Sequence, residues 1–422
     1  MDSRLSEYIK TDLIKSRNQF LNADTKARLY LICRKAAKYI MLLISFAAFI
    51  LLYALRFLVP VKIGILNSCR VGHLAANTEF RLRRQYPAIK QSNKGILFLS
   101  GNPANRQLLT MIKRQMPVLE NNLIYTVFML IRSFFPKSPI WADLSTAGPY
   151  SYDVWNHSPP QLSFIENEIK RGEEFLLSLG ILPGQSYICF CARDKTYLDK
   201  IQHFQTRKEW MYHDYRDNDI SNYLTASEFL AEQGLWALRM GAVVQKAINS
   251  YHPRVIDYAS RYRTDFADVY LMGHCKFFLG DTAGIFHLAR LFNVPCALAN
   301  LVPIGSSTTM AHDIVIPKKY RYFESKRFLT FFQVVAMGAD RWFKSQYFED
   351  EGIEVVENNP DEILALAQEM NARLDGTWKP HDEDEELQKA FWELFPPGHP
   401  VKGSPVRIGA EFLRQNQELL EM

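Results

Sequence analysis

The sequence has few cysteines, no glycine-rich dinucleotide-binding fingerprint and no internal repeat, and each absence narrows the class of protein. Its six cysteines, among 422 residues, lack the spacing of metal ligands, and we interpret them as reduced core thiols, as in a cytoplasmic protein. No Gly-x-Gly-x-x-Gly follows the first apolar run at 61–66, which argues against a dinucleotide oxidoreductase. A net charge of only +5 argues against a nucleic-acid partner, and the 48% hydrophobic content indicates a folded globular protein.

The N-terminal 60 residues differ in composition from the rest of the chain. Basic residues concentrate in 1–38, and the segment 39–55, YIMLLISFAAFILLYAL, contains 17 residues without a charge. This length is at the short end for crossing a bilayer, and no small-residue cleavage site marks a secretory signal. Basic residues are nearly balanced on its two sides, so the positive-inside rule assigns no orientation. We expect an amphipathic arm and an embedded or re-entrant membrane-anchor helix at 1–60, with a buried core helix as the alternative.

Beyond residue 60, short apolar runs alternate with helical segments, which predicts an α/β protein with parallel sheets. Strands are expected at 61–66, 95–99, 123–128, 186–192, 235–239, 277–279, 296–300 and 313–316, with a short strand or helix end at 268–270. Helices are expected at 78–85, 105–113, 162–179, 223–233 and 361–374. A single core rarely exceeds roughly 250 to 300 residues. We therefore expect two doubly wound domains, 61–180 and 181–345, followed by a helical extension at 346–422.

The segment 277–300, FFLGDTAGIFHLARLFNVPCALAN, predicts a phosphate-binding turn between a strand and a helix. Asp281 and Thr282 occupy the position of a helix N-cap, and Gly284 leaves room for a ligand beside the first amides. Those amides and the helix dipole favour an anion such as a diphosphate, to which His287 could add a hydrogen bond. The alternative is an ordinary capped helix with a structural histidine.

Other charged residues follow predicted strands at their carboxyl ends, where ligands gather in open α/β sheets. His73 is the candidate general base, because an imidazole titrates at about 6.5 and could take a proton from the hydroxyl of an acceptor substrate. Arg70 could hold either the donor or the acceptor of a group-transfer reaction. Arg193, Arg216 and Arg239 are candidates for neutralising a phosphate leaving group. The alternatives are helix packing for the histidine and ordinary ion pairs for the arginines.

Asp217-Asn218-Asp219 has the Asp-x-Asp spacing of metal-dependent glycosyltransferases. A helix dipole and arginines can replace a cation beside a phosphate. We therefore predict no metal and no other cofactor.

The turn resembles the donor-binding turn of GT-B glycosyltransferases, especially heptosyltransferase-like and O-fucosyltransferase-like enzymes. In those enzymes a D-[ST]-[AG]-G-x-x-H turn lies against the donor diphosphate, and a proline-led strand follows. The matching positions are Asp281, Thr282, Gly284, His287 and Pro295.

Two further resemblances extend beyond the turn. Arg193 resembles the donor-contacting arginine of the O-fucosyltransferase-like H-x-R-x-x-D loop, although no histidine precedes it here. From about residue 61 onward, the chain resembles a bacterial glycosyltransferase family of unassigned substrate that is associated with surface-polysaccharide synthesis.

The resemblance implies two Rossmann-like domains facing a cleft, the first holding the acceptor and the base and the second holding the nucleotide-sugar donor. It implies that the C-terminal extension packs back on the first domain. The function expected is inverting, metal-independent transfer of a sugar from a nucleotide-sugar donor to a glycan or lipid-linked acceptor. The expected location is the cytoplasmic face of the bacterial inner membrane.

Two alternatives are a nucleotide-sugar epimerase or hydrolase on the same fold, and a catalytically inactive membrane-tethered scaffold of polysaccharide assembly. The expected partners are the donor, the acceptor and the membrane surface, without nucleic acid. Homo-oligomer formation is left open.

Overall fold

The computed structural model describes residues 25–58, 62–144, 152–194, 196, 211–306 and 310–421. These residues form two compact units. The first unit comprises residues up to 70, 87–104 and 112–145, and the second comprises 71–86, 105–111 and residues from 146 onward. Both units contain parallel strands and helices, so the predicted mixed α/β fold is confirmed. The domain limits expected from the sequence stay predictions.

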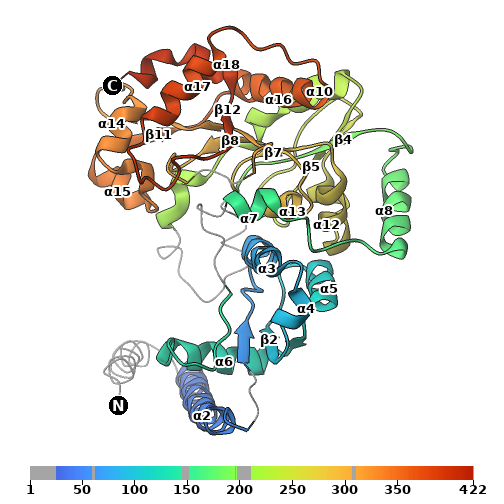
Figure 1. The fold of residues 1–422 in the computed structure, drawn as a ribbon, viewed down its shortest axis with the longest axis vertical. Helices are drawn as coiled ribbons and strands as arrows, with labels where there is room; N and C mark the ends of the chain where they lie inside the picture. The colour runs from blue at the N-terminus through green and yellow to red at the C-terminus, as the bar shows by residue number, and fades with distance from the viewer. Residues whose placement is uncertain are drawn as a thin grey trace. The chain divides into compact units, whose positions relative to one another are not determined.

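The first unit contains a three-stranded parallel sheet in the order β1-β2-β3, of which β2 is labelled in Figure 1. Its strands and helices are β1 (Lys62–Ile65), β2 (Ile96–Ser100), β3 (Val118–Glu120), α2 (Thr25–Leu55), α4 (Ile89–Ser92) and α6 (Asn122–Phe134), and α5 (Arg106–Gln115) has residues in both units. A single parallel bridge joins Ile63 to Trp141 on the other side of β1. The described strands of this unit therefore form a smaller sheet than the predicted doubly wound one.

The strand predicted at 123–128 is wrong, because these residues lie in helix α6. The Asn121 side chain accepts a hydrogen bond from the Ile124 amide at 3.0 Å and so caps the helix. Val127, Ile131 and Phe134 are buried at helical spacing, so the apolar run covers one face of a helix. The third strand instead lies upstream, at β3.

Helix α2 contains the segment predicted to attach to a membrane. One face of the helix packs within the first unit: Leu42 and Ser45 are buried, and the Phe49 ring stacks on Phe135 at a centroid distance of 4.2 Å. None of the described helices combines the length and the continuous apolar character that a membrane-spanning helix requires. Membrane attachment stays a prediction, and the arm before residue 25 lies outside the described residues.

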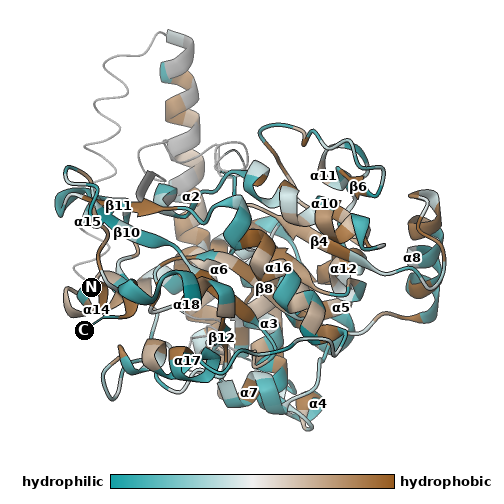
Figure 2. Cartoon of the chain, turned by 90° about the horizontal axis from the view of Figure 1, so that it is seen from above, coloured by the Kyte–Doolittle hydropathy of each residue, from teal (hydrophilic) through white to brown (hydrophobic). Residues whose placement is uncertain are grey.

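The second unit is built on a seven-stranded parallel sheet in the order β12-β9-β8-β7-β4-β5-β6 (Figure 1). The strands are β4 (Tyr187–Cys191), β5 (Trp236–Arg239), β6 (Val255–Ile256), β7 (Phe278–Gly280), β8 (Cys296–Leu301), β9 (Ile314–Pro317) and β12 (Arg407–Ile408). The winding reverses between β4 and β7, with β5 and β6 on one side and β7, β8 and β9 on the other. Strands β4 and β8 are buried along their whole length, and most of their residues are apolar (Figure 2).

Helices cover the sheet and extend the second unit. The α-helices are α3 (Val71–Gln85), α7 (Tyr152–His157), α8 (Glu166–Ser178), α10 (Leu224–Glu232), α11 (Tyr258–Arg261), α12 (Asp265–His274), α13 (Phe286–Leu291), α14 (Phe331–Ala336), α15 (Ser345–Asp350), α16 (Pro360–Leu374), α17 (Asp384–Glu393) and α18 (Ala410–Gln415). The 3-10 helices are η2 (Met211–Arg216), η3 (Ile220–Tyr223), η4 (Ala339–Arg341) and η5 (Gln417–Leu420). An antiparallel pair, β10 (Lys319–Tyr322) and β11 (Ile353–Val356), completes the described secondary structure.

Three expectations differ in detail from the structure. The 268–270 segment belongs to α12, whose first turn is capped when Thr264 accepts a hydrogen bond from the Ala267 amide at 3.1 Å. Helix α3 begins at residue 71 instead of 78. Cys33 and Cys69 are exposed, so the interpretation of all six cysteines as core thiols is wrong for these two.

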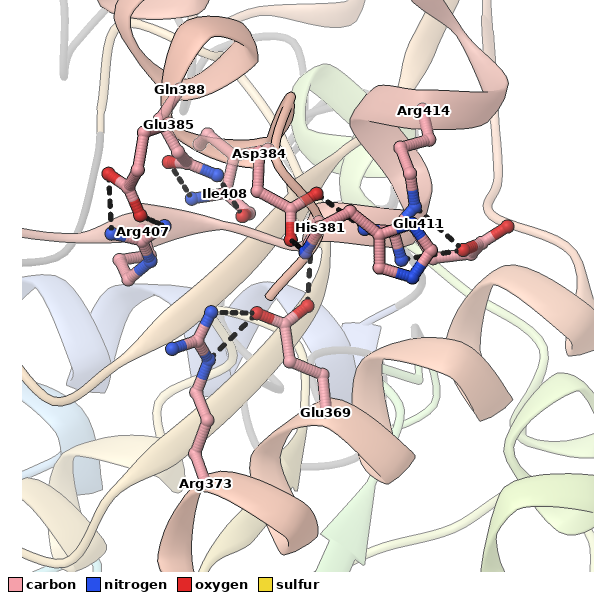
Figure 3. Close-up of polar contacts among 11 residues, drawn as sticks. Glu369, Arg373, His381, Asp384, Glu385, Gln388, Arg407, Ile408, Glu411 and Arg414 are labelled. Carbon is pink, nitrogen blue, oxygen red and sulfur yellow. Dashed lines mark hydrogen bonds and ion pairs between the residues drawn. The ribbon is translucent and has the colours of Figure 1, made fainter. Parts of the chain in front are cut away.

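Residues near the C-terminus are held to the second unit by buried polar contacts (Figure 3). Glu369 of α16 accepts a hydrogen bond from the Ala410 amide at 2.7 Å and pairs with Arg373 at 2.8 Å. Asp384 of α17 is buried and pairs with Arg414 of α18. Helices α16, α17 and α18 are therefore joined through charged groups as well as apolar packing.

Two buried asparagines connect β8 to the segment before α16. The backbone N–H of Asn300 donates to the side-chain oxygen of Asn358 at 2.7 Å. In return, the backbone N–H of Asn358 donates to the side-chain oxygen of Asn300 at 2.7 Å. Asn358 also donates to the Pro317 carbonyl at 3.0 Å. Asn300 has a positive φ of 59°, a backbone conformation that asparagine tolerates better than most residues.

Replacing Asn358 with alanine should lower the free energy of unfolding of the second unit by about 2 to 4 kcal/mol, because it leaves the Asn300 amide and the Pro317 carbonyl unpaired and buried. Urea denaturation followed by tryptophan fluorescence would measure the loss. The matched control is Asn249→Ala at an exposed position, which should change the value by less than about 0.5 kcal/mol. Equal stability of the two variants would contradict the assignment.

Candidate functional site

The Asp281 carboxylate joins three segments at the carboxyl ends of β4 and β7. One oxygen accepts hydrogen bonds from the Arg193 amide and the Asn218 side chain, both at 2.6 Å, and the other accepts from the Ala283 amide at 2.8 Å. These donors offset the cost of burying the carboxylate, which is 3% exposed. Helix α13 begins only at Phe286, so the predicted N-cap role of Asp281 is wrong, and the side chain instead organises the loops.

Arg216, at the end of η2, is attached to the same turn. Its Nη2 donates to the Thr282 carbonyl at 2.8 Å and to the Thr282 hydroxyl at 3.2 Å. Burial lowers the pKa of Arg216, and the positive charge of Arg193 lowers it further. Two guanidinium groups close enough to repel one another would both be stabilised by a bound anion.

Asp217 already forms an ion pair with one of these two guanidinium groups, that of Arg193. Its Oδ1 lies 3.1 Å from Arg193 Nε. Burial raises the pKa of Asp217 to about 6, although Arg193 acts in the opposite direction. The Asp217 carboxyl group therefore loses its proton near pH 6. Above that pH, the resulting carboxylate competes with any anionic ligand for Arg193.

Lys318, directly after β9, holds the backbone of the loop that carries Arg216. Its buried ammonium donates to the Tyr215 carbonyl at 3.1 Å and to the Asp217 carbonyl at 3.0 Å. Burial lowers the pKa of Lys318 to about 8. We call Arg193, Arg216, Asp217, Asn218, Asp281, Thr282 and Lys318 the Asp281 cluster.

The N-terminus of α3 packs against the turn that follows Asp281. A Cβ atom on Gly72 would lie 2.8 Å from the Gly284 Cα, so the two backbones approach too closely for a side chain at residue 72. The first amides of a helix lack intrahelical acceptors and carry the positive end of its dipole. Helix α3, which has 15 residues, therefore places N–H donors beside the turn.

Two histidines lie close to this contact. His73, in the first turn of α3, is exposed. Burial lowers the pKa of His287 well below its ordinary value, and the charges of Arg290, His73 and Arg216 act in the same direction. His287 is therefore neutral, and its buried Nδ1 has no hydrogen-bond partner among the residues that the structure describes.

Arg239 and Arg70 are not shown to join the Asp281 cluster. Arg239 is buried and contacts Asp257 at 3.1 Å and the Lys246 carbonyl at 3.2 Å, which is an internal ion pair of the second unit. Arg70 belongs to the first unit. The roles expected for these arginines, and for the other candidate site residues, stay predictions.

The two carboxylates of the Asp-x-Asp sequence, at residues 217 and 219, contact different residues. Asp217 contacts Arg193, whereas Asp219 accepts a hydrogen bond from the Ser221 amide at 2.9 Å and lies 3.5 Å from Lys246. Among the residues that the structure describes, no group of three or more His, Cys, Asp or Glu side chains is placed to hold a metal ion. Metal independence stays a prediction.

Sequence reasoning missed the structural roles of Asn218 and Lys318. Asn218 lies in a polar run where no pattern distinguishes it from its neighbours. Lys318 lies two residues after the predicted strand 313–316, and this position was the one signal that the sequence offered. Its burial depends on loops distant in sequence.

Comparison with solved structures finds resemblances to three glycosyltransferases. The chain is 14% identical to E. coli ADP-heptose lps heptosyltransferase II (TM-score 0.38, covering 61% of this chain and 90% of that one). It is 10% identical to a glycosyl transferase family 9 protein from Veillonella parvula DSM 2008 (TM-score 0.37, covering 61% and 86%). It is 11% identical to the iron-containing dodecameric glycosyltransferase TibC from enterotoxigenic E. coli H10407 (TM-score 0.31, covering 60% and 61%).

All three scores lie below 0.5, so neither fold nor activity is inferred from these resemblances. No protein-family profile and no curated protein matches the chain.

Replacing Asp217 with asparagine should stabilise the second unit at pH 7 by about 3 kcal/mol relative to the unsubstituted protein. The folded-state pKa of Asp217 is raised from 3.8 to about 6, so its contribution to stability is fully present below about pH 4 and is lost as the pH rises through 6. Asparagine cannot ionise and avoids this loss.

Urea denaturation between about pH 4 and pH 8 would measure the difference between Asp217→Asn and the unsubstituted protein. Asp382→Asn, at an exposed position, is the control and should show no such pH dependence. A gain for Asp217→Asn that is the same at every pH would contradict the assignment.

Proposed function

We propose that the protein is a glycosyltransferase that moves a sugar from a nucleotide-sugar donor to a glycan or lipid-linked acceptor in bacterial surface-polysaccharide synthesis. The proposed transfer inverts the anomeric centre and requires no metal. The proposed location is the cytoplasmic face of the inner membrane.

The convergence of Arg216, the 281–284 turn and the N-terminus of α3 carries this proposal. A departing nucleoside diphosphate carries negative charge, and stabilising that charge is the main electrostatic demand of the reaction. Arg216 is already ordered by Thr282, so little side-chain freedom is lost when it binds a ligand. The amides of α3 supply further donors at the same place.

His73 is the proposed general base. It is exposed, so an acceptor hydroxyl can reach it, and it lies near His287 and the turn. In the proposed step the acceptor oxygen bonds to the anomeric carbon and its proton passes to His73. The bond from that carbon to the diphosphate breaks, and the electron pair leaves with the diphosphate.

The nature of the reaction is testable without knowing the substrate. UDP-, GDP-, ADP- and CMP-sugars would be screened for thermal stabilisation, since a ligand at a hundredfold excess over its Kd stabilises by about 2.7 kcal/mol. Turnover that needs an added acceptor supports transfer. Donor consumption at the same rate without an acceptor indicates hydrolysis, and binding of no nucleotide sugar would contradict the proposal.

Replacing Arg216 with alanine should weaken donor binding by about ten- to a hundredfold, because a charge-assisted hydrogen bond contributes about 1.5 to 3 kcal/mol. Titration calorimetry with the donor identified in the screen would measure the change. Arg261→Ala, at an exposed position of the same unit, is the matched control and should bind as the unsubstituted protein does. Unchanged affinity in Arg216→Ala would remove this arginine from the donor site.

Replacing His73 with alanine should lower kcat by about 10² to 10⁴ while leaving donor affinity nearly unchanged, because a general base acts on the acceptor proton. His157→Ala, at an exposed position on α7, is the control for losing a surface histidine. Because a base must be deprotonated, kcat of the unsubstituted enzyme should fall at acid pH. Full turnover in His73→Ala would exclude the role.

A further inference from the structure

The two faces of helix α2 have different environments, although both are apolar. On the inner face, Phe46 lies 6.0 Å from Phe134 and 5.7 Å from Phe135, between ring centroids. Ser45, also on this face, is fully buried and donates its hydroxyl proton to the Met41 carbonyl at 2.7 Å. The first unit therefore covers one side of α2.

The outer face of α2 exposes large apolar side chains over most of the helix. They recur at helical spacing within one arc: Leu29, Ile40, Leu43, Ile44, Leu51 and Leu55. Leu43, for example, is 71% exposed. Apolar colour is visible along the helix in Figure 2. Surface apolar residues are normally scattered, and a contiguous stripe of this kind marks an interaction site.

The charges of this region are complementary to an anionic surface. Helix α2 contains no acidic residue. Residues 1–38 contain nine Lys or Arg against four Asp or Glu, and Lys62, beyond the other end of the helix, is exposed. At the C-terminal end of the helix, the Arg56 guanidinium lies 3.5 Å from the centre of the partly exposed Tyr53 ring, which also stacks on Phe49 of the inner face. Such pairing of basic and aromatic groups with an apolar face is typical of helices lying in a membrane interface.

We propose that the outer face of α2 binds flat in the headgroup and acyl-chain boundary of a bilayer rich in anionic lipid, while the inner face stays packed on the first unit. A helix of 31 residues is about 45 Å long, and its stripe suits an extended apolar layer. A protein partner would normally present a polar rim with hydrogen bonds, and the stripe consists of apolar side chains. This binding extends the proposed location and does not depend on sugar transfer.

The exposed cysteines provide a direct test in the full chain. Cys33 lies on the outer face of α2, and Cys69 is an exposed thiol elsewhere in the first unit. Phosphatidylcholine vesicles containing phosphatidylglycerol should slow the reaction of Cys33 with a charged maleimide at least tenfold, while Cys69 reacts within twofold of its original rate. Peptide mass spectrometry separates the two sites. Vesicles of phosphatidylcholine alone, or high salt, should give weaker protection.

Substitutions on the outer face give a second readout. The triple variant Leu43→Gln, Ile44→Gln, Leu51→Gln should reduce partitioning into the anionic vesicles at least tenfold in a flotation assay. The matched control replaces three exposed leucines of the second unit, Leu177→Gln, Leu182→Gln and Leu374→Gln, and should leave partitioning unchanged. Circular dichroism would verify that both variants keep their helical content.

Two results would overturn the inference. Equal labelling of Cys33 with and without vesicles would show that the face does not enter lipid. Protection of Cys33 without vesicles that increases with protein concentration would assign the face to a second copy of the chain. No nucleotide sugar is present in these assays, so their failure would leave the proposed sugar transfer untouched.

Discussion

The hydrogen bonds of the buried Asp281 carboxylate are the constraint on which the arrangement of the candidate site depends. They tie the loop after β4, the loop before η3 and the turn after β7 to a single side chain. Arg216 donates to Thr282 in that turn, and Lys318 donates to the carbonyls of Tyr215 and Asp217 on either side of Arg216. An aspartate that serves first as an internal anchor positions cationic groups more accurately than flexible loops could.

The contact between α3 and the turn after β7 also fixes the geometry of the site, here through backbone atoms. Glycine at residue 72 lets the helix terminus approach Gly284 directly, so peptide groups replace side chains at the point of contact. Burial lowers the pKa of His287 and keeps it neutral, and burial raises the pKa of Asp217 towards neutrality. The positive charge of the site therefore comes from the guanidinium groups and the Lys318 ammonium, without a contribution from His287, and the proposed base is the histidine that remains open to solvent.

Much of the sheet was predictable, because strands buried on both faces appear as short apolar runs, such as 186–192. The same signal failed at 123–128, where the cap at Asn121 turns a similar run into a helix. The turn residues were predictable from their resemblance to a known motif, but the role of Asp281 was not. Its donors Arg193 and Asn218 are 88 and 63 positions away in sequence. Only the folded chain shows that the Asp281 carboxylate already accepts hydrogen bonds from within the protein. The burial of Lys318 could not be predicted either, because it too depends on residues distant in sequence.

The pairing of β12 with β9 has a consequence for biosynthesis. Residues 407–408 form an outer strand of a sheet whose other strands all lie between residues 187 and 317. While the ribosome is still adding the last part of the chain, β9 remains an uncovered edge with free peptide groups. Completion of this unit therefore has to wait until translation has passed residue 408, and nascent chains stalled before that point would present a surface for chaperones or for unwanted strand pairing.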